Sequence, residues 1–311
     1  MEFFIVSLLN GVVYGLLLFM VSAGLTLIFG MMGILNMAHA SFYMIGAYVG
    51  FVVGGHSFLF GLLIAPLFTA LIGVLMERYL LRPIHSYGHG HQLMFTFGFA
   101  FVVEEIIKLL FGDFPVNYAA PSYLTFTAFD VFGTHFPFYR VFIGLVACAI
   151  FAIVYLLLTR TRLGIIVRAA ESLPVMTASL GHDVPLVFGG VFAAGAGMAG
   201  LAGAVGGAYY PTSPNMAMEF GVIVFVVVVV GGLGSVVGSL WASLLIGILT
   251  SFTIGADVSL QSLATALGIG HLAAKLGAAA EVSISMFAGA VPFILMLIVL
   301  LVRPMGLMGR R

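Results

Sequence analysis

Long apolar runs, separated by short polar interruptions, dominate the chain. A transmembrane helix needs about 20 mainly apolar residues at a rise of about 1.5 Å each. The runs that approach this length are Phe3–Phe29, Ile34–Val53, Phe58–Met76, Leu93–Phe111, Val141–Leu158, Val187–Ala208, Gly221–Val230, Val236–Phe252 and Phe287–Val302. Glycine interrupts several of them and the run from Gly221 is short. The pattern therefore predicts about eight or nine crossings, some of them broken helices.

Small residues recur at helical spacing inside two of these runs. Gly195, Ala199, Gly203 and Gly207 lie four residues apart, and Ser7, Gly11 and Gly15 repeat the spacing near the N-terminus. In lipid, helices associate through close backbone approach at such positions. We therefore expect a tightly packed helix bundle.

Composition supports a membrane protein. The 311 residues are 62% hydrophobic and only 7% charged, whereas soluble domains carry about 25% charged residues. The formal net charge is zero, which argues against a nucleic-acid partner. We predict an all-α polytopic protein in the lipid bilayer, with residues 1–311 as one transmembrane domain.

Basic residues orient the chain. Short loops rich in Lys and Arg lie on the cytoplasmic side, and Arg clusters at 78–82, at 160–168 and at the C-terminus. We expect these three regions, and so the C-terminus, to be cytoplasmic. The acidic loop from Asp113 to Phe136 suits the outer side. No Lys or Arg precedes Arg78, which leaves the N-terminus unoriented and leaves open whether Ile34–Val53 crosses or re-enters.

One polar stretch, GILNMAHASFYM (33–44), stands between apolar runs. It carries Asn36, His39, Ser41 and Tyr43. If a helix begins at Asn36, then Asn36, His39 and Tyr43 share one face, which must point into the bundle. Two interpretations stay open: a polar lining of a translocation path, or a stripe that hydrogen-bonds two helices. A metal site is not predicted, because no second ligand stands at a suitable spacing.

A second polar group lies in VVEEIIKLLFGD (102–113). Glu104 and Lys108 are four residues apart and are expected to pair, with Glu105 pointing elsewhere. Ionisable residues in a span suggest function, here at a substrate entrance. Their place near the outer end also allows a purely structural pair.

The stretch RTRLGIIVRAAESLPVMTASLGHD (160–183) has the character of a soluble segment. Ser172 is a candidate N-cap, Pro174 suits the first turn, and Gly181 is a candidate terminator. We expect a short helix of about two turns in a cytoplasmic loop, about 159–184. It serves either to dock a partner or to anchor the loop at the membrane surface.

No motif for chemistry accompanies these features. The glycine-rich GGLGSVVGS (231–239) lacks the lysine of a phosphate-binding loop, and no H-E-x-x-H motif occurs. We expect no cofactor in this chain and no enzymatic activity. If ATP drives transport, another polypeptide hydrolyses it. The segment 255–284 places Leu260, Leu263 and Leu267 on one face, which predicts an amphipathic helix on the outer surface.

Several of these passages, in order, resemble the branched-chain amino acid permease family of bacterial ABC importers. They are GLTLIFGMMGILNMAHASFYMIGAY (24–48), TFGFAFVVEEIIKLLFG (96–112), VRAAESLPVMTASLG (167–181), VVVVVGGLGSVVGSLWASLLIGIL (226–249) and RPMGLMG (303–309). The resemblance covers nearly the whole chain. It implies a multi-pass protein of the bacterial inner membrane that transports branched-chain amino acids.

The resemblance also implies partners and roles. Such permeases work with a second related permease subunit, two ATP-binding cassette subunits that hold ATP-Mg, and a periplasmic substrate-binding protein. Residues 169–181 match the loop that docks into the ATPase, with Arg168, Ala170, Glu171 and Gly181 as its key positions. Asn36 and His39 match a broken-helix signature near the path, and Glu104 or Glu105 matches an acidic position.

Two alternatives stay open. An ion-driven secondary transporter often shows paired broken helices in both halves, but the second half of this chain has no counterpart to NMAHAS. ABC permeases of related sequence also serve urea, short amides and aromatic acids, and no residue here distinguishes among these substrates.

Overall fold

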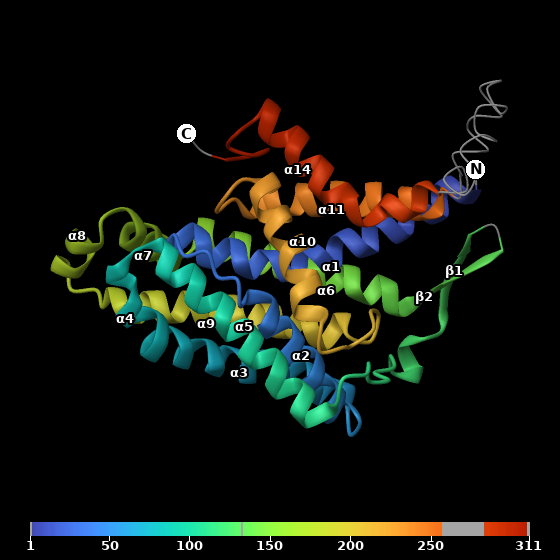
Figure 1. Ribbon diagram of the computed structural model, residues 1–311, viewed down its shortest axis with the longest axis horizontal. Coiled ribbons are helices and arrows are strands. Elements are labelled where there is room, and N and C mark those ends of the chain that lie inside the picture. Colours follow the sequence, from blue (N-terminus) through green and yellow to red (C-terminus); the bar gives the residue numbers. More distant parts are fainter. Residues whose placement is uncertain (1, 132, 257–282, 310–311) are drawn as a thin grey trace, which may run out of the picture.

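The computed structural model describes residues 2–131, 133–256 and 283–309, nearly all of them in a bundle of long helices (Figure 1). The helices are α1 (Glu2–Met32), α2 (His39–Gly54), α3 (Phe58–Leu75), α4 (Arg82–Ile84), α5 (His89–Phe111), α6 (Phe138–Arg160), α7 (Arg162–Ser172), α8 (Pro174–Ser179), α9 (Val184–Gly206), α10 (Met216–Gly231), α11 (Val236–Gly255) and α14 (Val291–Val302). A π-helical turn, Met76–Leu81, joins α3 to α4, and a 3₁₀-helix, Ile284–Ala290, precedes α14.

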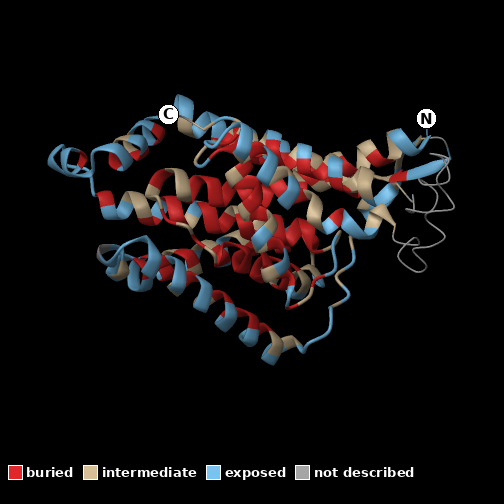
Figure 2. Cartoon of the chain, turned by 45° about the horizontal axis from the view of Figure 1, so that its top comes forward, coloured by how far each residue is buried: buried red, intermediate tan, exposed pale blue. Residues whose placement is uncertain are grey.

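Six helical stretches are long and apolar enough to cross a bilayer: Glu2–Met32, Phe58–Ile84, Phe138–Arg160, Val184–Gly206, Val236–Gly255 and Ile284–Val302. The prediction of a polytopic helical membrane protein is confirmed. Two further apolar helices, α2 and α10, have only 16 residues each. The most buried span is Glu2–Met32, whereas few positions are buried in Phe58–Ile84, Phe138–Arg160 and Ile284–Val302. Figure 2 shows the buried positions gathered in the middle of the bundle.

The two ends of the bundle differ. Helices α4, α7 and α8 lie at one end, here called the α7–α8 end (Figure 1). A β-hairpin of β1 (Thr127–Val131) and β2 (Thr134–Pro137) lies at the other, here called the hairpin end, together with the start of α1. The hairpin was not predicted. Alternation of side chains and a positive φ of 84° at Gly133 favour this antiparallel pair, in which Phe129 stacks on Phe136 at 4.9 Å.

Both predicted rows of small residues are helix contacts. A Cβ built on Gly11 meets the backbone of Ile248 in α11 at 2.6 Å. On α9, a Cβ on Gly203 lies 2.0 Å from the carbonyl oxygen of Tyr43 in α2. No side chain fits in such spaces, so glycine sets the distance between these helices.

The loop 159–184 holds two helices rather than one. Ser172 is not an N-cap: it ends α7, and its hydroxyl donates to the carbonyl of Arg168 at 3.0 Å. The break falls at Leu173 (φ −139°, ψ 68°), because a residue before proline is driven out of helical geometry. The prediction for Gly181 is confirmed, since its φ of +87° follows the end of α8. The predicted amphipathic segment, about 255–284, lies almost wholly outside the described residues.

Candidate functional site: a buried polar stretch and a cavity beside the α7–α8 loop

A helix that begins at Asn36 was considered from the sequence, and the structure does not have one there. Residues 33–36 are irregular and α2 starts at His39, three residues later. The reason is local: the Asn36 side-chain oxygen accepts the backbone N–H of Ala38 at 3.1 Å, while its carbonyl accepts that of His39. Such an amide-closed turn competes with the helix and comes before it.

The run 34–53 connects the two ends of the bundle. It starts at the α7–α8 end, where Gly33 lies near His89, and α2 finishes near Tyr118 at the hairpin end. The first part is extended and the second helical. A broken helix that is enclosed by protein is the form in which membrane interiors tolerate irregular backbone.

All four polar side chains of this stretch are buried, at no more than 2% exposure: Asn36, His39, Ser41 and Tyr43. The His39 Nε2 is 3.0 Å from the carbonyl oxygen of Val21 in α1, so Nε2 carries the proton. Within the described residues, Asn36 Nδ2, His39 Nδ1, Ser41 Oγ and the Tyr43 hydroxyl have no hydrogen-bond partner. Each orphaned group costs about 1–3 kcal/mol. Clusters of such groups are rare in protein interiors.

Glycines bring neighbouring helices onto this stretch. A Cβ on Gly24 of α1 lies 2.9 Å from the His39 ring, and one on Gly206 of α9 lies 2.7 Å from the Tyr43 hydroxyl. The Tyr43 ring also packs on Phe220 of α10, with centroids 5.0 Å apart. The polar stretch is therefore held between α1, α9 and α10, and a shift of any of these helices changes its surroundings.

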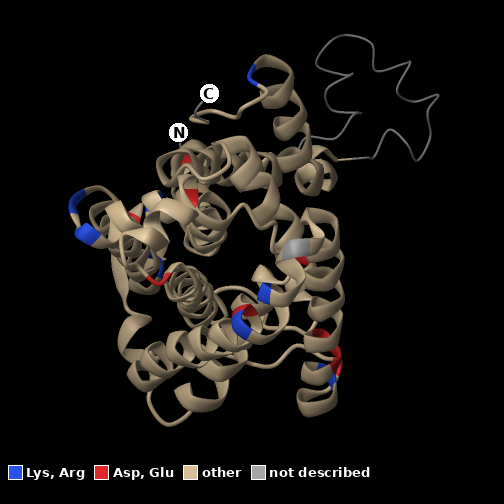
Figure 3. Ribbon diagram, turned by 90° about the vertical axis from the view of Figure 1, so that its left-hand side faces the viewer, with Lys and Arg blue, Asp and Glu red and all other residues tan. Residues whose placement is uncertain are grey.

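The acidic pair of α5 shares one lysine. Lys108 Nζ lies 2.7 Å from Glu104, which confirms the predicted pair, and 2.9 Å from Glu105. The expectation that Glu105 points elsewhere is wrong, because the flexible ammonium reaches carboxylates three and four residues back. Glu104 is buried and Glu105 exposed. The three groups carry a net charge of −1 in a bundle with few charges (Figure 3).

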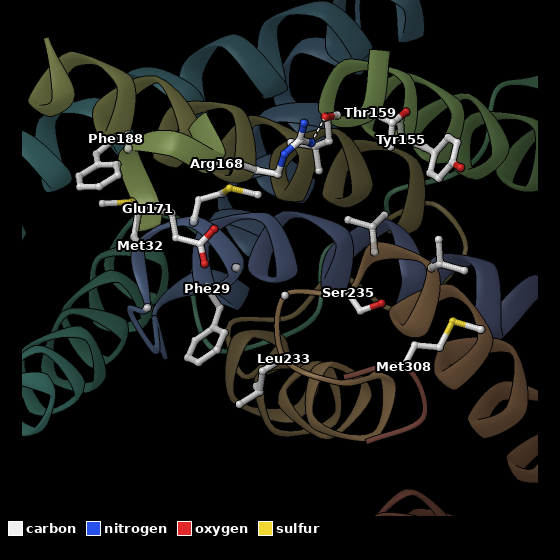
Figure 4. A pocket seen from close by; sticks show the side chains of 18 of the residues that line it. Phe29, Met32, Tyr155, Thr159, Arg168, Glu171, Phe188, Leu233, Ser235 and Met308 are labelled. Atoms are coloured by element: carbon white, nitrogen blue, oxygen red, sulfur yellow. Dashed lines mark hydrogen bonds between the residues drawn. The ribbon is translucent and has the colours of Figure 1, made fainter. Parts of the chain in front are cut away.

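A cavity of about 750 Å³ opens at the α7–α8 end (Figure 4). Its walls are the end of α1, the end of α6, helix α7, Phe188 of α9 and the glycine-rich turn Leu233–Ser235. Arg168, Ala170 and Glu171 all line it, and the Arg168 guanidinium donates to the carbonyl of Leu158. Partial burial raises the pKa of the Glu171 carboxyl above its ordinary value. Gly181 lies apart from this cavity, at the end of α8.

An ion pair between a buried carboxylate and an exposed arginine joins two helices at this end, and the sequence patterns did not identify it. Arg82 donates to Glu77 through Nε at 3.1 Å and through a terminal nitrogen at 2.7 Å. The same terminal nitrogen donates to the carbonyl of Pro185, in the first turn of α9. The two residues are five apart, a spacing that meets on one face only in the π-helical turn Met76–Leu81. The usual search at three or four residues therefore passes over it.

We name Glu77, Arg82 and Pro185 the inner anchor. It joins the end of α3 to the start of α9, directly after the α7–α8 loop. The Glu77 side chain is 4% exposed and that of Arg82 is 40% exposed. The anchor therefore connects the end of α3 to α9, which follows the α7–α8 loop directly in the chain.

Comparison with known proteins identifies one family. The family model described as "Branched-chain amino acid transport system / permease component" matches residues 7–300. The high-affinity branched-chain amino acid transport system permease protein BraD of Pseudomonas aeruginosa is 26% identical, over 98% of this chain and 95% of its own. The permease protein LivH of the corresponding system in Escherichia coli K12 is 27% identical, over 99% and 96%; that of Salmonella typhimurium is 26% identical over the same shares. No solved structure matches the chain.

Proposed function

This chain belongs to the family of branched-chain amino acid transport permeases, and we propose that it is the transmembrane permease subunit of an ATP-driven importer for branched-chain amino acids. The observation that carries the proposal is the family match across residues 7–300, with similar relatives matched over nearly their full length. The chain is a multi-pass membrane protein. Transport, rather than catalysis, is its role.

The proposal includes separate ATPase subunits. The glycine-rich turn before α11 has no lysine to hold a phosphate, so ATP-Mg is bound and hydrolysed on two ATP-binding cassette partners. Helices α7 and α8 project at one end of the bundle, where they fit a groove on such a partner (Figure 1). A second permease subunit and a periplasmic binding protein complete the assembly.

We place the α7–α8 end in the cytoplasm and the hairpin end outside the bacterial inner membrane. The basic residues Arg78, Arg160, Arg162 and Arg168 all belong to the α7–α8 end, which supports this orientation. The C-terminal residues pack there too, since the N–H of Leu307 donates to Val230. The N-terminus is then outside. The broken segment 34–54 counts as a crossing, and α5 and α10 cross as well, for about nine crossings.

The transport step is a change in the relative stability of two bundle arrangements. ATP binding closes the ATPase pair and pulls on α7 and α8. The inner anchor passes the motion to α3 and α9, and the glycine face of α9 carries it to His39 and Tyr43. Those groups, with Asn36 and Ser41, form the polar layer of the path, and Glu104 and Glu105 act at its outer approach. The unpartnered hydroxyls and ring nitrogen suit a ligand that passes briefly rather than one that stays.

Purification of the tagged chain from its host in a mild detergent tests the proposal. Mass spectrometry is expected to find two ATPase chains and a second permease with it. A chain that purifies alone, and that carries an amino acid into liposomes without ATP, would instead be a secondary transporter.

A further inference from the structure

A second cavity, of about 400 Å³, lies at the hairpin end. Four elements enclose it: the first turns of α1, the start of α6, the turn after α9 and the last turn of α11. It is remote from the α7–α8 loop, and none of the residues proposed above for the path or for the ATPase contact lines it. Its size is at the lower end of the range of small-molecule sites, about 300–1,000 Å³.

Arg140 is the cation of this cavity. Its guanidinium donates to the side-chain oxygen of Asn10 and lies 5.2 Å from the ring centroid of Phe136 and 5.8 Å from that of Tyr209. Among the described residues no carboxylate lies within ion-pair distance of it. A guanidinium has five N–H donors. The Arg140 guanidinium is half-buried and contacts one amide and two rings, so some of its N–H donors remain available to an anion.

The rest of the cavity supplies complementary groups. Thr250 is 7% exposed, and its hydroxyl has no partner in the described part of the chain. The Tyr14 and Tyr210 rings stack at 6.0 Å and give a flat apolar wall. Burial, then the neighbouring Tyr209, then Glu219 raise the pKa of the Tyr210 phenol. One cation, one free buried hydroxyl and an aromatic wall describe a receptor for a small molecule with a carboxylate and an apolar part.

We propose that this cavity is an outer binding site for the transported amino acid, with Arg140 holding its carboxylate and Tyr14 and Tyr210 packing on its side chain. The proposal rests on the function proposed above. A planar guanidinium matches a carboxylate with two parallel hydrogen bonds, and the Thr250 hydroxyl accepts from the ammonium group. Both ends of an α-amino acid are thereby recognised. The Ser251 hydroxyl is already engaged, since it donates to the backbone carbonyl of Ser7 at 2.8 Å.

The site explains how a ligand released by a binding protein is received at the outer end. The buried layer of His39 and Tyr43 lies deeper, and a weak site above it gives the released amino acid a defined first position. The cavity is not sealed from solvent, since two of the residues that line it are only half-buried, Arg140, or exposed, Tyr210.

The test uses the purified complex in lipid nanodiscs without the binding protein. Saturation-transfer NMR is recorded with leucine and with leucinamide, which lacks the carboxylate. We expect transfer to the leucine methyl groups in the wild type and a loss of about tenfold or more with Arg140→Gln, because a charge-assisted pair of bonds is removed. Arg140→Lys is expected to restore part of the signal, and Thr250→Val to weaken it. Asp130→Asn, in the exposed hairpin pair with His135, is the matched control and should bind as the wild type does.

Three results would overturn the inference. One is equal transfer to leucine in the wild type and in Arg140→Gln. Another is equal transfer to leucine and leucinamide. The third is anionic lipid retained by the wild type and lost from Arg140→Gln, with no leucine signal in either, which would assign Arg140 to a lipid phosphate.

The failure of the proposed function is a separate result. It would show as absence of ATP-driven leucine uptake by the wild-type complex with its binding protein. Uptake by the wild type together with leucine contacts that ignore Arg140 rejects only the outer site. The conservative Arg140→Lys and Thr250→Val variants keep the test decisive if Arg140→Gln does not fold.

Discussion

The inner anchor predicts that replacing Arg82 and replacing Glu77 have unequal effects on stability, because the two side chains differ in burial. In Arg82→Met the Glu77 carboxylate stays buried, at 4% exposure, and loses its only ion-pair partner among the described residues. In Glu77→Gln the Arg82 side chain, at 40% exposure, still reaches water and keeps the Pro185 carbonyl. We therefore expect removal of the more exposed partner to be the more damaging change.

The magnitudes follow from burial. Stranding a buried charge costs about 3–5 kcal/mol. Loss of the Glu77 charge alone, with an amide oxygen still present as an acceptor, costs about 1–2 kcal/mol. In the Glu77→Gln background no charge is left to strand, so adding Arg82→Met should cost only about 1 kcal/mol more. The double variant should thus be more stable than Arg82→Met alone, by about 1–2 kcal/mol.

Unfolding in mixed micelles, with a denaturing detergent as titrant, measures these differences across the four proteins. Leucine uptake and ATP hydrolysis by the assembled complex report the functional side, where the single variants should hydrolyse ATP but import less. Arg78→Met, the neighbouring arginine without an ion pair in the described structure, is the control. Equal costs for both single variants, or strictly additive costs in the double variant, would refute the reasoning.

Three further predictions concern the path and the loop. His39→Ala should lower uptake by about tenfold or more. It should lower the melting temperature by only a few degrees, because it removes one hydrogen bond, to Val21. Matching losses in a thermal scan and an uptake assay would favour a packing role. Glu171→Gln combined with Gly181→Val should uncouple ATP hydrolysis from uptake without unfolding the bundle, since a branched side chain is strained at a φ of +87°; normal uptake by a well-expressed double variant contradicts this. Gly203→Val should destabilise the α2–α9 contact by about 1–3 kcal/mol or more. The control is Gly190→Ala on the same helix, where a Cβ meets nothing within 4 Å. Similar unfolding curves for the two variants would contradict this prediction.

Sequence patterns predicted the structure correctly where a feature follows from the length of an apolar run or from the spacing of one residue type. Apolar length predicted membrane helices, and small residues every four positions predicted the faces where α1 meets α11 and α9 meets α2. Gly181 was identified as a helix end because few other residues accept its backbone geometry. These features depend on local chemistry alone.

Features that depend on local competition or on unusual geometry were missed. The break at Leu173 arises from a proline rule that outweighed the capping potential of Ser172. The start of α2 was displaced by the side-chain turn of Asn36. The pair of Glu77 and Arg82 needs a π-helical turn, which no spacing rule announces.

The outer cavity was missed for another reason. Arg140 is separated by more than 100 residues from the partners that define its surroundings, Asn10 and Thr250. A single arginine in the first turn of an apolar helix carries no signal of its own. Only the fold brings it beside a free hydroxyl and a stack of tyrosines.

The most direct test of the central claim is radiolabelled leucine uptake into liposomes that hold the chain with its co-purified partners and the binding protein. We predict uptake that requires ATP on the side of the α7–α8 loop and that stops when ATP is replaced by ADP. Leucine uptake by this chain alone, driven by an ion gradient and indifferent to ATP, would contradict the account.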